Sequence, residues 1–401
     1  MHHSRNAKHE GAIMTKGLIV LALSYALSQF YRAFLPVLSP ILKQDLGATP
    51  QDLATASGVW FLVFAAMQIP VGSALDRFGP RWTASILFAL GGAGGALVFA
   101  LAQTPAHIIW AMALLGIGCS PVLMAAYYIF ARQYPARLFA TLATAMIGLG
   151  SLGNIAGASP LAWCVESFGW RPTLLALAAI SLATALGIAA LARDPERTPG
   201  PSRGSVIDLL KMPALWPIFA FMFVCYAPSA GLRGLWAGPY AAEVFGADTQ
   251  IIGRVTLVMG LAMIAGSFAY GPMDRLLGTR KWVVVAGNAL ALAALIALAL
   301  DPAASLVRST VLLAVLGFGG AAYGMIIAHA RAFFPPHLTG RGVTLMNLFG
   351  IGGVGVMQNA TGPIYRMGTT PEQSFTLIFA AFAVLLAAGL LIYLTATDRT
   401  D

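Results

Sequence analysis

Apolar runs of about 20 residues recur along the whole chain, and they constrain its fold more than any other feature. Of the 401 residues, 58% are hydrophobic and 10% are charged, whereas roughly 25% of the residues of a soluble domain are charged. The 43 glycines and 23 prolines are ordinary for membrane helices. We therefore expect an all-α polytopic membrane protein.

Twelve apolar segments can be delimited, six on each side of a polar linker. They cover residues 18–38, 53–74, 83–102, 107–130, 138–164, 172–191, 215–240, 251–273, 283–300, 306–330, 342–364 and 374–395. The sequence thus predicts an N-terminal tail at 1–17, a six-helix domain at 18–192, a linker at 193–214, a second six-helix domain at 215–396 and a C-terminal tail at 397–401. A short surface helix is expected within the linker, over 205–212.

The distribution of lysine and arginine predicts the orientation. With both termini in the cytoplasm, the inner tails and loops hold 17 of the 24 basic residues, as the positive-inside rule requires. The outer side holds Lys43, Arg171, Arg254, Arg308 and Arg366. We expect a multi-pass protein of the cell inner membrane. The net charge of +9 follows this loop pattern, so nucleic acid is not an expected partner.

Two arginines, 201 residues apart, occupy the same local pattern. Tyr25-x-x-Ser28-x-x-x-Arg32 recurs as Tyr226-x-x-Ser229-x-x-x-Arg233. Residues spaced at i, i+3 and i+7 share one helical face. Each arginine lies deep in an apolar run, where a charge costs at least ~2.5 kcal/mol and is usually functional.

Other motifs repeat with the arginines. Gly116-Ile117-Gly118 matches Gly317-Phe318-Gly319, again 201 residues apart, and Asp-Arg follows both the second and the eighth segment. Parallel repeats of this kind are a transporter architecture, with the substrate held near the midplane between the halves.

The chain resembles the major facilitator superfamily of secondary transporters over essentially its whole length. The resemblance rests on Asp76-Arg77-x-Gly79, its weaker copy at Asp274-Arg275, and Phe168-Gly169-Trp170-Arg171. It implies alternating access by two rocking six-helix domains, with no cofactor, no metal and no covalent chemistry, so the protein is not expected to be an enzyme. A monomer is expected.

The repeated loops after the second and eighth segments are predicted to gate the transporter. Glycines permit close approach and a tight turn, and the aspartate can pair with a basic residue across the domain interface in one conformation only. The candidate gating residues are Gly72, Asp76, Arg77, Gly79, Asp274 and Arg275.

The resemblance also implies that the first, fourth, seventh and tenth segments line a central cavity, so Arg32 and Arg233 should face it. Arginine forks bind carboxylate, phosphate and similar oxyanions in a bidentate manner. All 15 Asp and Glu residues lie in loops, tails or helix ends, so a small anionic solute is the expected counter-charge. The arginine placement resembles that of organic-anion and organophosphate exchangers. The candidate substrate-binding residues are Tyr25, Ser28, Arg32, Tyr127, Tyr226, Ser229, Arg233, Trp236, Tyr323 and Gln358.

Several alternatives remain open. The arginines could bond backbone carbonyls or snorkel to an interface. Met259-x-x-x-Met263 and Met325-x-x-x-His329 would suit a soft-metal importer, and a receptor without transport activity is a further possibility. A proton-coupled exporter of drugs or metabolites is a third. It is disfavoured because Met112 stands where many proton-driven members carry arginine, and the glycines of residues 148–157 include no Gly-Pro pair. Those glycines are expected to let helices pack closely.

Overall fold

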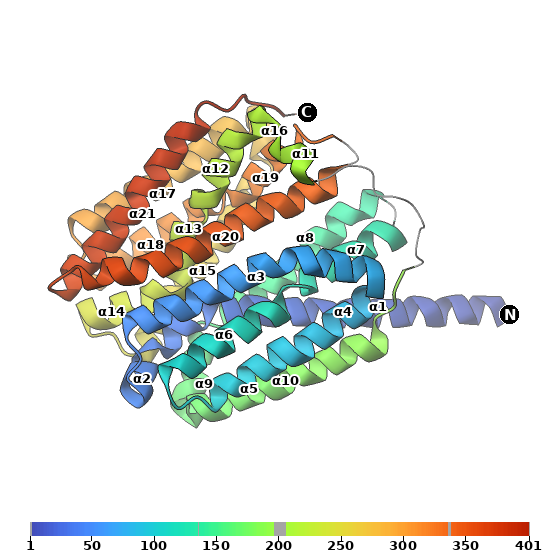
Figure 1. The fold of residues 1–401 in the computed structure, drawn as a ribbon, viewed down its shortest axis with the longest axis horizontal. Helices are drawn as coiled ribbons and strands as arrows, with labels where there is room; N and C mark the ends of the chain where they lie inside the picture. The colour runs from blue at the N-terminus through green and yellow to red at the C-terminus, as the bar shows by residue number, and fades with distance from the viewer. Residues whose placement is uncertain (1, 135, 196–205, 336–337, 401) are drawn as a thin grey trace. The chain divides into compact units, whose positions relative to one another are not determined.

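A computed structural model describes residues 2–134, 136–195, 206–335 and 338–400, and the side chains of 2–15, 136–141, 143–144, 274 and 340 lie outside the description. All regular structure in these ranges is helical (Figure 1). The chain divides into two compact units: unit 1 comprises Met1–Phe34 and Ala66–Gly200, and unit 2 comprises Leu35–Ala65 and Pro201–Asp401. Unit 2 thus includes a segment that precedes the linker by more than a hundred residues. The domain boundaries predicted from the sequence stay a prediction.

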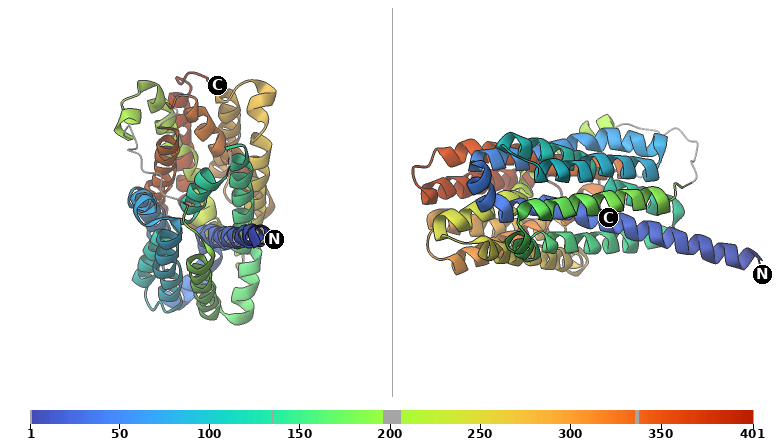
Figure 2. Two further views of the ribbon diagram at one scale, coloured as in Figure 1. Left: turned by 90° about the vertical axis from the view of Figure 1, so that its right-hand side faces the viewer. Right: turned by 90° about the horizontal axis from the view of Figure 1, so that it is seen from below.

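Unit 1 is built from the following helices: α1 (His2–Ala33), the second part of α3 (Pro50–Phe78), α4 (Pro80–Leu87), the π-helix η1 (Phe88–Ala93), α5 (Gly94–Ala100), α6 (Pro105–Cys119), α7 (Val122–Gln133), α8 (Ala136–Ala156), α9 (Ser159–Phe168) and α10 (Trp170–Leu191). The segment predicted as an N-terminal tail is helical from His2 onward. The first turns of α1 extend beyond the other helices of unit 1 (Figure 2).

Unit 2 is built from more numerous and shorter helices. They are α2 (Leu35–Leu46), the first part of α3, α11 (Val206–Leu210), the 3₁₀ turn η2 (Pro213–Leu215), α12 (Trp216–Cys225), α13 (Ala227–Gly231), the π-helix η3 (Leu232–Trp236), α14 (Ala237–Phe245), α15 (Thr249–Tyr270), α16 (Met273–Leu277), α17 (Lys281–Leu300), α18 (Leu306–Gly320), α19 (Tyr323–Arg331), α20 (Thr339–Arg366) and α21 (Pro371–Tyr393). The helix predicted within the linker is confirmed as α11.

Many of these helices combine into membrane spans. Within the described ranges, nine helical stretches are long and apolar enough to cross a bilayer, and the broken pair α1–α2 makes up to ten. Each of the twelve apolar segments predicted from the sequence falls on helix. The expected all-α polytopic fold is confirmed.

Two spans are broken at equivalent points of the repeat. α6 ends at Cys119 and α7 begins at Val122, while α18 ends at Gly320 and α19 begins at Tyr323, 201 residues later. Pro121 at the first break has no backbone N–H to continue the ladder. The two halves therefore repeat an irregularity of the backbone as well as a sequence pattern.

Glycines set the closest helix contacts inside each unit. A Cβ at Gly153 of α8 would lie 1.7 Å from the carbonyl oxygen of Ala26 in α1. A Cβ at Gly353 of α20 would lie 1.8 Å from the carbonyl oxygen of Phe223 in α12. No side chain fits at either place, which confirms the expected close helix packing at Gly153, whereas a Cβ at Gly148 would meet nothing within 4 Å.

Candidate anion-binding site

The arginine of unit 2 lies on an irregular part of its span. Arg233 belongs to η3, where hydrogen bonds run from i to i+5; such π-segments often occur at functional sites. Its side chain is buried, at 5% exposure. The residue of α15 that faces the guanidinium is Gly260. A Cβ at this position would lie 3.2 Å from Nε and Nη2 of Arg233. The guanidinium thus occupies space that a larger residue would take.

The other repeat residues of unit 2 lie on α12, α13 and their neighbours. The Ser229 hydroxyl donates to the carbonyl of Tyr226 over 3.2 Å, and a Cβ at Gly320 would lie 2.5 Å from Ser229 Oγ. The rings of Tyr226 and Tyr323 have centroids 4.6 Å apart. The Tyr323 hydroxyl donates to Asn347 Oδ1 over 2.5 Å. The structure therefore brings Tyr226 and Tyr323 together, and it adds Asn347.

Gln358 of α20 is a buried amide in the same unit. It is fully buried, and neither its Oε1 nor its Nε2 has a hydrogen-bond partner among the described residues. It lies against α13, since a Cβ at Gly231, two residues before Arg233, would be 2.6 Å from Gln358 Oε1. An unsatisfied buried amide costs roughly 1–3 kcal/mol, so this group is suited to a polar ligand or water.

Trp236, one turn beyond Arg233, is fixed by α20. Its indole Nε1–H donates to Thr361 Oγ1 over 2.8 Å, and its ring stacks on Tyr365 with centroids 5.3 Å apart. The side chain is fully buried. Trp236 is therefore a packed wall of unit 2 that connects the arginine segment to α20.

The arginine of unit 1 has a cysteine of α6 as a neighbour. Arg32 lies in the last turn of α1 and is half-buried. The Cys119 thiol at the end of α6 is within hydrogen-bonding reach of Ser28 and within electrostatic reach of Arg32. Cys119 therefore lies beside the repeat residues of α1. Its position directly before the broken turn of the span was the signal that could have identified it.

Tyr25 and Tyr127 lie near each other inside unit 1. Gln29 Nε2 donates to the Tyr25 hydroxyl over 3.2 Å, and Tyr127 lies within electrostatic reach of Tyr25. The Tyr25 ring covers α8, since a Cβ at Gly150 would lie 2.3 Å from it. The spacing of Gln29 places it on a different face of α1 from Arg32. Its hydrogen bond to the Tyr25 hydroxyl nevertheless connects it to the face that carries Arg32. That Arg32 and Arg233 face a common cavity stays a prediction.

The loop signature of unit 1 forms a network that includes a residue missed from sequence. Gly79 has φ of 85° and caps α4, and a Cβ there would lie 2.5 Å from the Asp194 carboxylate. Asp194 accepts from the Arg81 backbone N–H over 2.8 Å. Gly79 is therefore required both by its positive φ and by the carboxylate beside it.

The remaining gating candidates of unit 1 are exposed. Asp76 Oδ1 lies 3.8 Å from Arg132 Nη2 of α7, and the Asp76 side chain is 72% exposed. The Arg77 guanidinium lies over the Phe78 ring. The close approach expected at Gly72 is not found, because no atom lies within 4 Å of a Cβ placed there. Pairing of Asp76 across the domain interface stays a prediction.

Unit 2 repeats the Asp194 network with a different residue. Asp398, just after α21, accepts from the Thr279 hydroxyl over 2.5 Å and from the Lys281 backbone N–H over 3.0 Å. Burial raises the pKa of Asp398, but these hydrogen bonds outweigh it, and the net effect lowers the pKa. Arg275 is exposed, and the Asp274 side chain lies outside the described residues.

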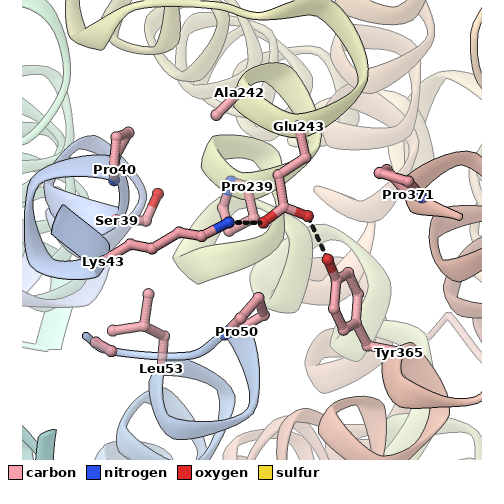
Figure 3. A pocket seen from close by; sticks show the side chains of 11 residues that line it. Ser39, Pro40, Lys43, Pro50, Leu53, Pro239, Ala242, Glu243, Tyr365 and Pro371 are labelled. Atoms are coloured by element: carbon pink, nitrogen blue, oxygen red, sulfur yellow. Dashed lines mark hydrogen bonds and ion pairs between the residues drawn. The ribbon is translucent and has the colours of Figure 1, made fainter.

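A second polar cluster lies at the ends of helices in unit 2. Lys43 Nζ of α2 is 3.1 Å from Glu243 Oε1 of α14, and the Tyr365 hydroxyl of α20 donates to Glu243 Oε2. These side chains border a cavity of about 500 Å³ (Figure 3). Glu243 lies at a helix end, as expected for the acidic residues, although α14 continues to Phe245, beyond the end of the apolar segment at Tyr240.

His329, one of the candidate soft-metal ligands, is held by two hydrogen bonds. Its Nδ1 lies 2.6 Å from the Tyr393 hydroxyl and its Nε2 lies 2.9 Å from the Thr397 carbonyl oxygen. A carbonyl can only accept, so Nε2 carries the proton and Nδ1 accepts from the tyrosine. Both nitrogens are occupied, and the residue is a packing residue with no lone pair for a metal.

The comparison with known families decides the affiliation of the chain. The sequence model of the Major Facilitator Superfamily matches residues 21–354. The chain belongs to the Major Facilitator Superfamily. Solved members have the same fold: a D-xylose-proton symporter aligns with a TM-score of 0.78 at 14% identity, over 96% of this chain and 98% of that one. A bacterial homologue of the human lysosomal transporter Spinster aligns with a TM-score of 0.73 at 19% identity, over 94% and 96%.

Relatives within the superfamily are named as transporters of organic anions. The probable sulfoacetate transporter SauU of Cupriavidus necator is 24% identical over 284 residues, 65% of each protein. A putative tartrate transporter of Agrobacterium vitis is 23% identical over 286 residues, 63% of this chain and 62% of that one. Human monocarboxylate transporter 11 is 31% identical over 173 residues, 41% and 36%. The chain spans less than two thirds of the length of each of these relatives.

Proposed function

We propose that the protein is a secondary transporter that moves a small organic anion across the cell inner membrane by alternating access. The solute class is a carboxylate, sulfonate or phosphate-type anion. Membership of the superfamily supports transport. The named cargoes of three relatives, sulfoacetate, tartrate and monocarboxylates, support the sign of the charge, since each carries at least one carboxylate.

The observation that carries the proposal is Arg233, an arginine at 5% exposure within the span Pro213–Phe245. A guanidinium at such a place is costly to keep unless it has a function. Its fork matches carboxylate and phosphate oxygens, and Arg32 repeats the arrangement in unit 1. Buried Gln358 supplies an amide that can complete the hydrogen bonds of an oxyanion.

The remaining features of the proposal follow from the loops and the bilayer. A cytoplasmic location of both termini accounts for the excess of lysine and arginine in alternate loops. The lipid bilayer is the constant partner of the exposed apolar side chains on the spanning helices. A monomer is sufficient, because each unit carries its own arginine.

The competing cargoes fit the described residues less well. Of the candidate soft-metal ligands, His329 already has both ring nitrogens in hydrogen bonds. Cationic drugs would meet the repulsion of two arginines.

The proposal is tested by binding and uptake with the purified protein. Thermal stability is measured with sulfoacetate, tartrate, propionate and the neutral isostere propionamide, since a ligand of the native state raises stability. Uptake of the stabilising anion is then measured in proteoliposomes. We expect stabilisation by at least one anion and none by propionamide. Stabilisation by copper(I) that Met259→Leu abolishes, with no response to any anion, would instead support the metal importer.

A further inference from the structure

Two broken spans of unit 2 meet at a pair of tyrosines. One span is interrupted between α12, which ends at Cys225, and α13, which begins at Ala227; the other is interrupted between Gly320 and Tyr323. The rings of Tyr226 and Tyr323, one from each break, have centroids 4.6 Å apart. Irregular backbone at membrane depth is tolerated where it is buried in protein or lines a water-filled cavity, and broken spans often form transporter binding sites. The contact between the two breaks is therefore a candidate binding surface.

Asn347 of α20 adds an amide to this contact. The Tyr323 hydroxyl donates to Asn347 Oδ1 over 2.5 Å, so the capacity that remains on the amide is the donor group at Nδ2. Asn347 Nδ2 donates to no acceptor among the described residues. Tyr226, Tyr323 and Asn347 are each half-buried. An amide donor turned toward lipid would cost roughly 1–3 kcal/mol, so this side of Asn347 is suited to water or to a solute.

The internal repeat shows that the fold does not require this polar pair. With the spacing of 201 residues, Tyr323 corresponds to Val122 and Asn347 corresponds to Met146. Val122 and Met146 are both buried. Helix packing at the equivalent place of unit 1 is thus achieved with two apolar side chains. The amide and the phenol of unit 2 therefore serve a purpose other than packing.

The position of the pair along the span limits the solutes that can reach both it and the arginine. Tyr226 precedes Arg233 by seven residues, which corresponds to about 10 Å of helical rise. Hydrogen bonds of about 3 Å at both ends leave about 4 Å for the solute itself. Covalent bonds of about 1.5 Å cover this distance when an oxygen substituent is on carbon 4 of a carboxylic acid, and they fall short when it is on carbon 2.

We propose that Asn347 determines specificity by donating a hydrogen bond to a second oxygen of the transported anion. The inference rests on the proposed function and narrows the solute to a carboxylate with an uncharged oxygen, such as a hydroxyl, on carbon 4. The carboxylate binds Arg233, and the distal oxygen accepts from Asn347 Nδ2. Tyr323 is a positioning residue, since its hydroxyl holds Oδ1. The amide carries no charge, so a second carboxylate there would lose hydration without gaining a counter-charge.

The test compares three anions that differ by one hydroxyl: butyrate, 4-hydroxybutyrate and 2-hydroxybutyrate. Binding to the purified wild-type protein is measured by calorimetry at pH 7, where each carboxylate is ionised. We expect 4-hydroxybutyrate to bind about threefold to tenfold more tightly than butyrate, as a hydrogen bond between neutral groups allows. 2-Hydroxybutyrate should bind like butyrate, because its hydroxyl is too close to the carboxylate to reach the amide. This comparison needs no variant.

Substitutions then locate the hydrogen bond. Asn347→Leu keeps the size of the side chain and removes the amide, so 4-hydroxybutyrate should lose its advantage while the Kd of butyrate stays within about twofold. Tyr323→Phe keeps the ring beside Tyr226 and releases Oδ1, so the advantage should shrink. Asn359→Leu is the matched control on α20, because the Asn359 amide donates to the Gly355 carbonyl of its own helix over 2.8 Å. It should keep the advantage seen in the wild type.

The outcomes separate this inference from the proposed function. Equal affinity for butyrate and 4-hydroxybutyrate in the wild type, or an advantage that survives Asn347→Leu, would overturn the role of Asn347. An equal advantage of 2-hydroxybutyrate would overturn the spacing. If sulfoacetate or tartrate binds and none of the three butyrates does, the inferred solute class is wrong while the transporter proposal stands. Binding of no anion at all would contradict the proposed function itself.

Discussion

At the scale of single residues, the side chains around Arg233 are small where it needs space and polar where a ligand could meet it. Gly260 leaves room for the guanidinium, and Gln358 brings an amide without a described hydrogen-bond partner to the same unit. The cost of a charge within the membrane is met only if such neighbours and a ligand compensate it. Substitutions at these positions should therefore change binding before they change folding.

Replacing either arginine should weaken anion binding. Arg233→Ala and Arg32→Ala each remove charge-assisted hydrogen bonds of roughly 1.5–3 kcal/mol, which corresponds to about a tenfold to hundredfold loss of affinity. Uptake in proteoliposomes should be nearly abolished, and lysine should rescue only part of it because the planar fork is lost. Arg254→Ala, at an exposed position of α15, is the control. Full uptake by either alanine variant would disprove the arginine site.

Gly260→Ala tests the space beside the guanidinium. The added Cβ would lie 3.2 Å from Nε and Nη2 of Arg233, so the arginine must move by a few tenths of an ångström. We expect a severalfold higher Kd for the anion with unchanged expression. Gly324→Ala, which faces open space on α19, should bind like the wild type. Equal affinity in Gly260→Ala would show that the arginine does not need this position.

At the scale of helices, the same contact occurs in both units: an aspartate that follows the last long helix accepts hydrogen bonds from the N-terminus of another helix. Asp194 follows α10 and binds the start of α4, while Asp398 follows α21 and binds the start of α17. A carboxylate there satisfies backbone N–H groups and complements the helix dipole. The loops at these helix ends are thereby fixed within each unit.

Asp398→Ala should destabilise the protein by about 1 kcal/mol at pH 7, which is typical of a lost cap. The pKa of Asp398 is lowered in the folded state, so its contribution is present above the ordinary value of about 3.9 and is lost as pH falls through the lowered pKa. Thermal unfolding in detergent at pH 7 and at decreasing pH should show a difference from wild type that shrinks with acid. A difference that grew on acidification would contradict this sign.

At the scale of the whole molecule, alternating access requires contacts that form in one conformation and break in another. The pair of Asp76 and Arg132 joins the end of α3 to the end of α7, and Arg132 also lies over the Tyr128 ring. Both side chains lie at helix ends, and that of Asp76 is 72% exposed. The charge at Asp76 should therefore bias the conformational equilibrium and leave the affinity for the anion unchanged.

Asp76→Asn should slow turnover more than it weakens binding, because a loop charge shifts populations only through its different contacts in the two states. Distances between spin labels on the loops that follow α3 and α16 should show a changed distribution, while the Kd of the anion stays within about twofold. Lost affinity with an unchanged distribution would show that Asp76 acts on the site directly.

Much of the fold and part of the site could be predicted from sequence. The spans, the repeat and the two arginines follow from local properties: the length of apolar runs, the cost of a charge within them and an identical spacing 201 residues apart. The close packing at Gly153 followed from the same kind of pattern. The end of α14 did not, because Glu243 and Phe245 continue a helix beyond the last residue of the apolar run.

Only the tertiary structure decided the partners of the polar groups. Lys43 meets Glu243 across 200 residues, Tyr365 meets Glu243 across 122, and Asp194 meets Arg81 across 113. It also decided that both nitrogens of His329 are occupied and that Gly72 faces open space. A sequence pattern reports which face a residue occupies along its own helix. Which distant side chain lies opposite depends on how the helices pack, and that information is in no local stretch of the chain.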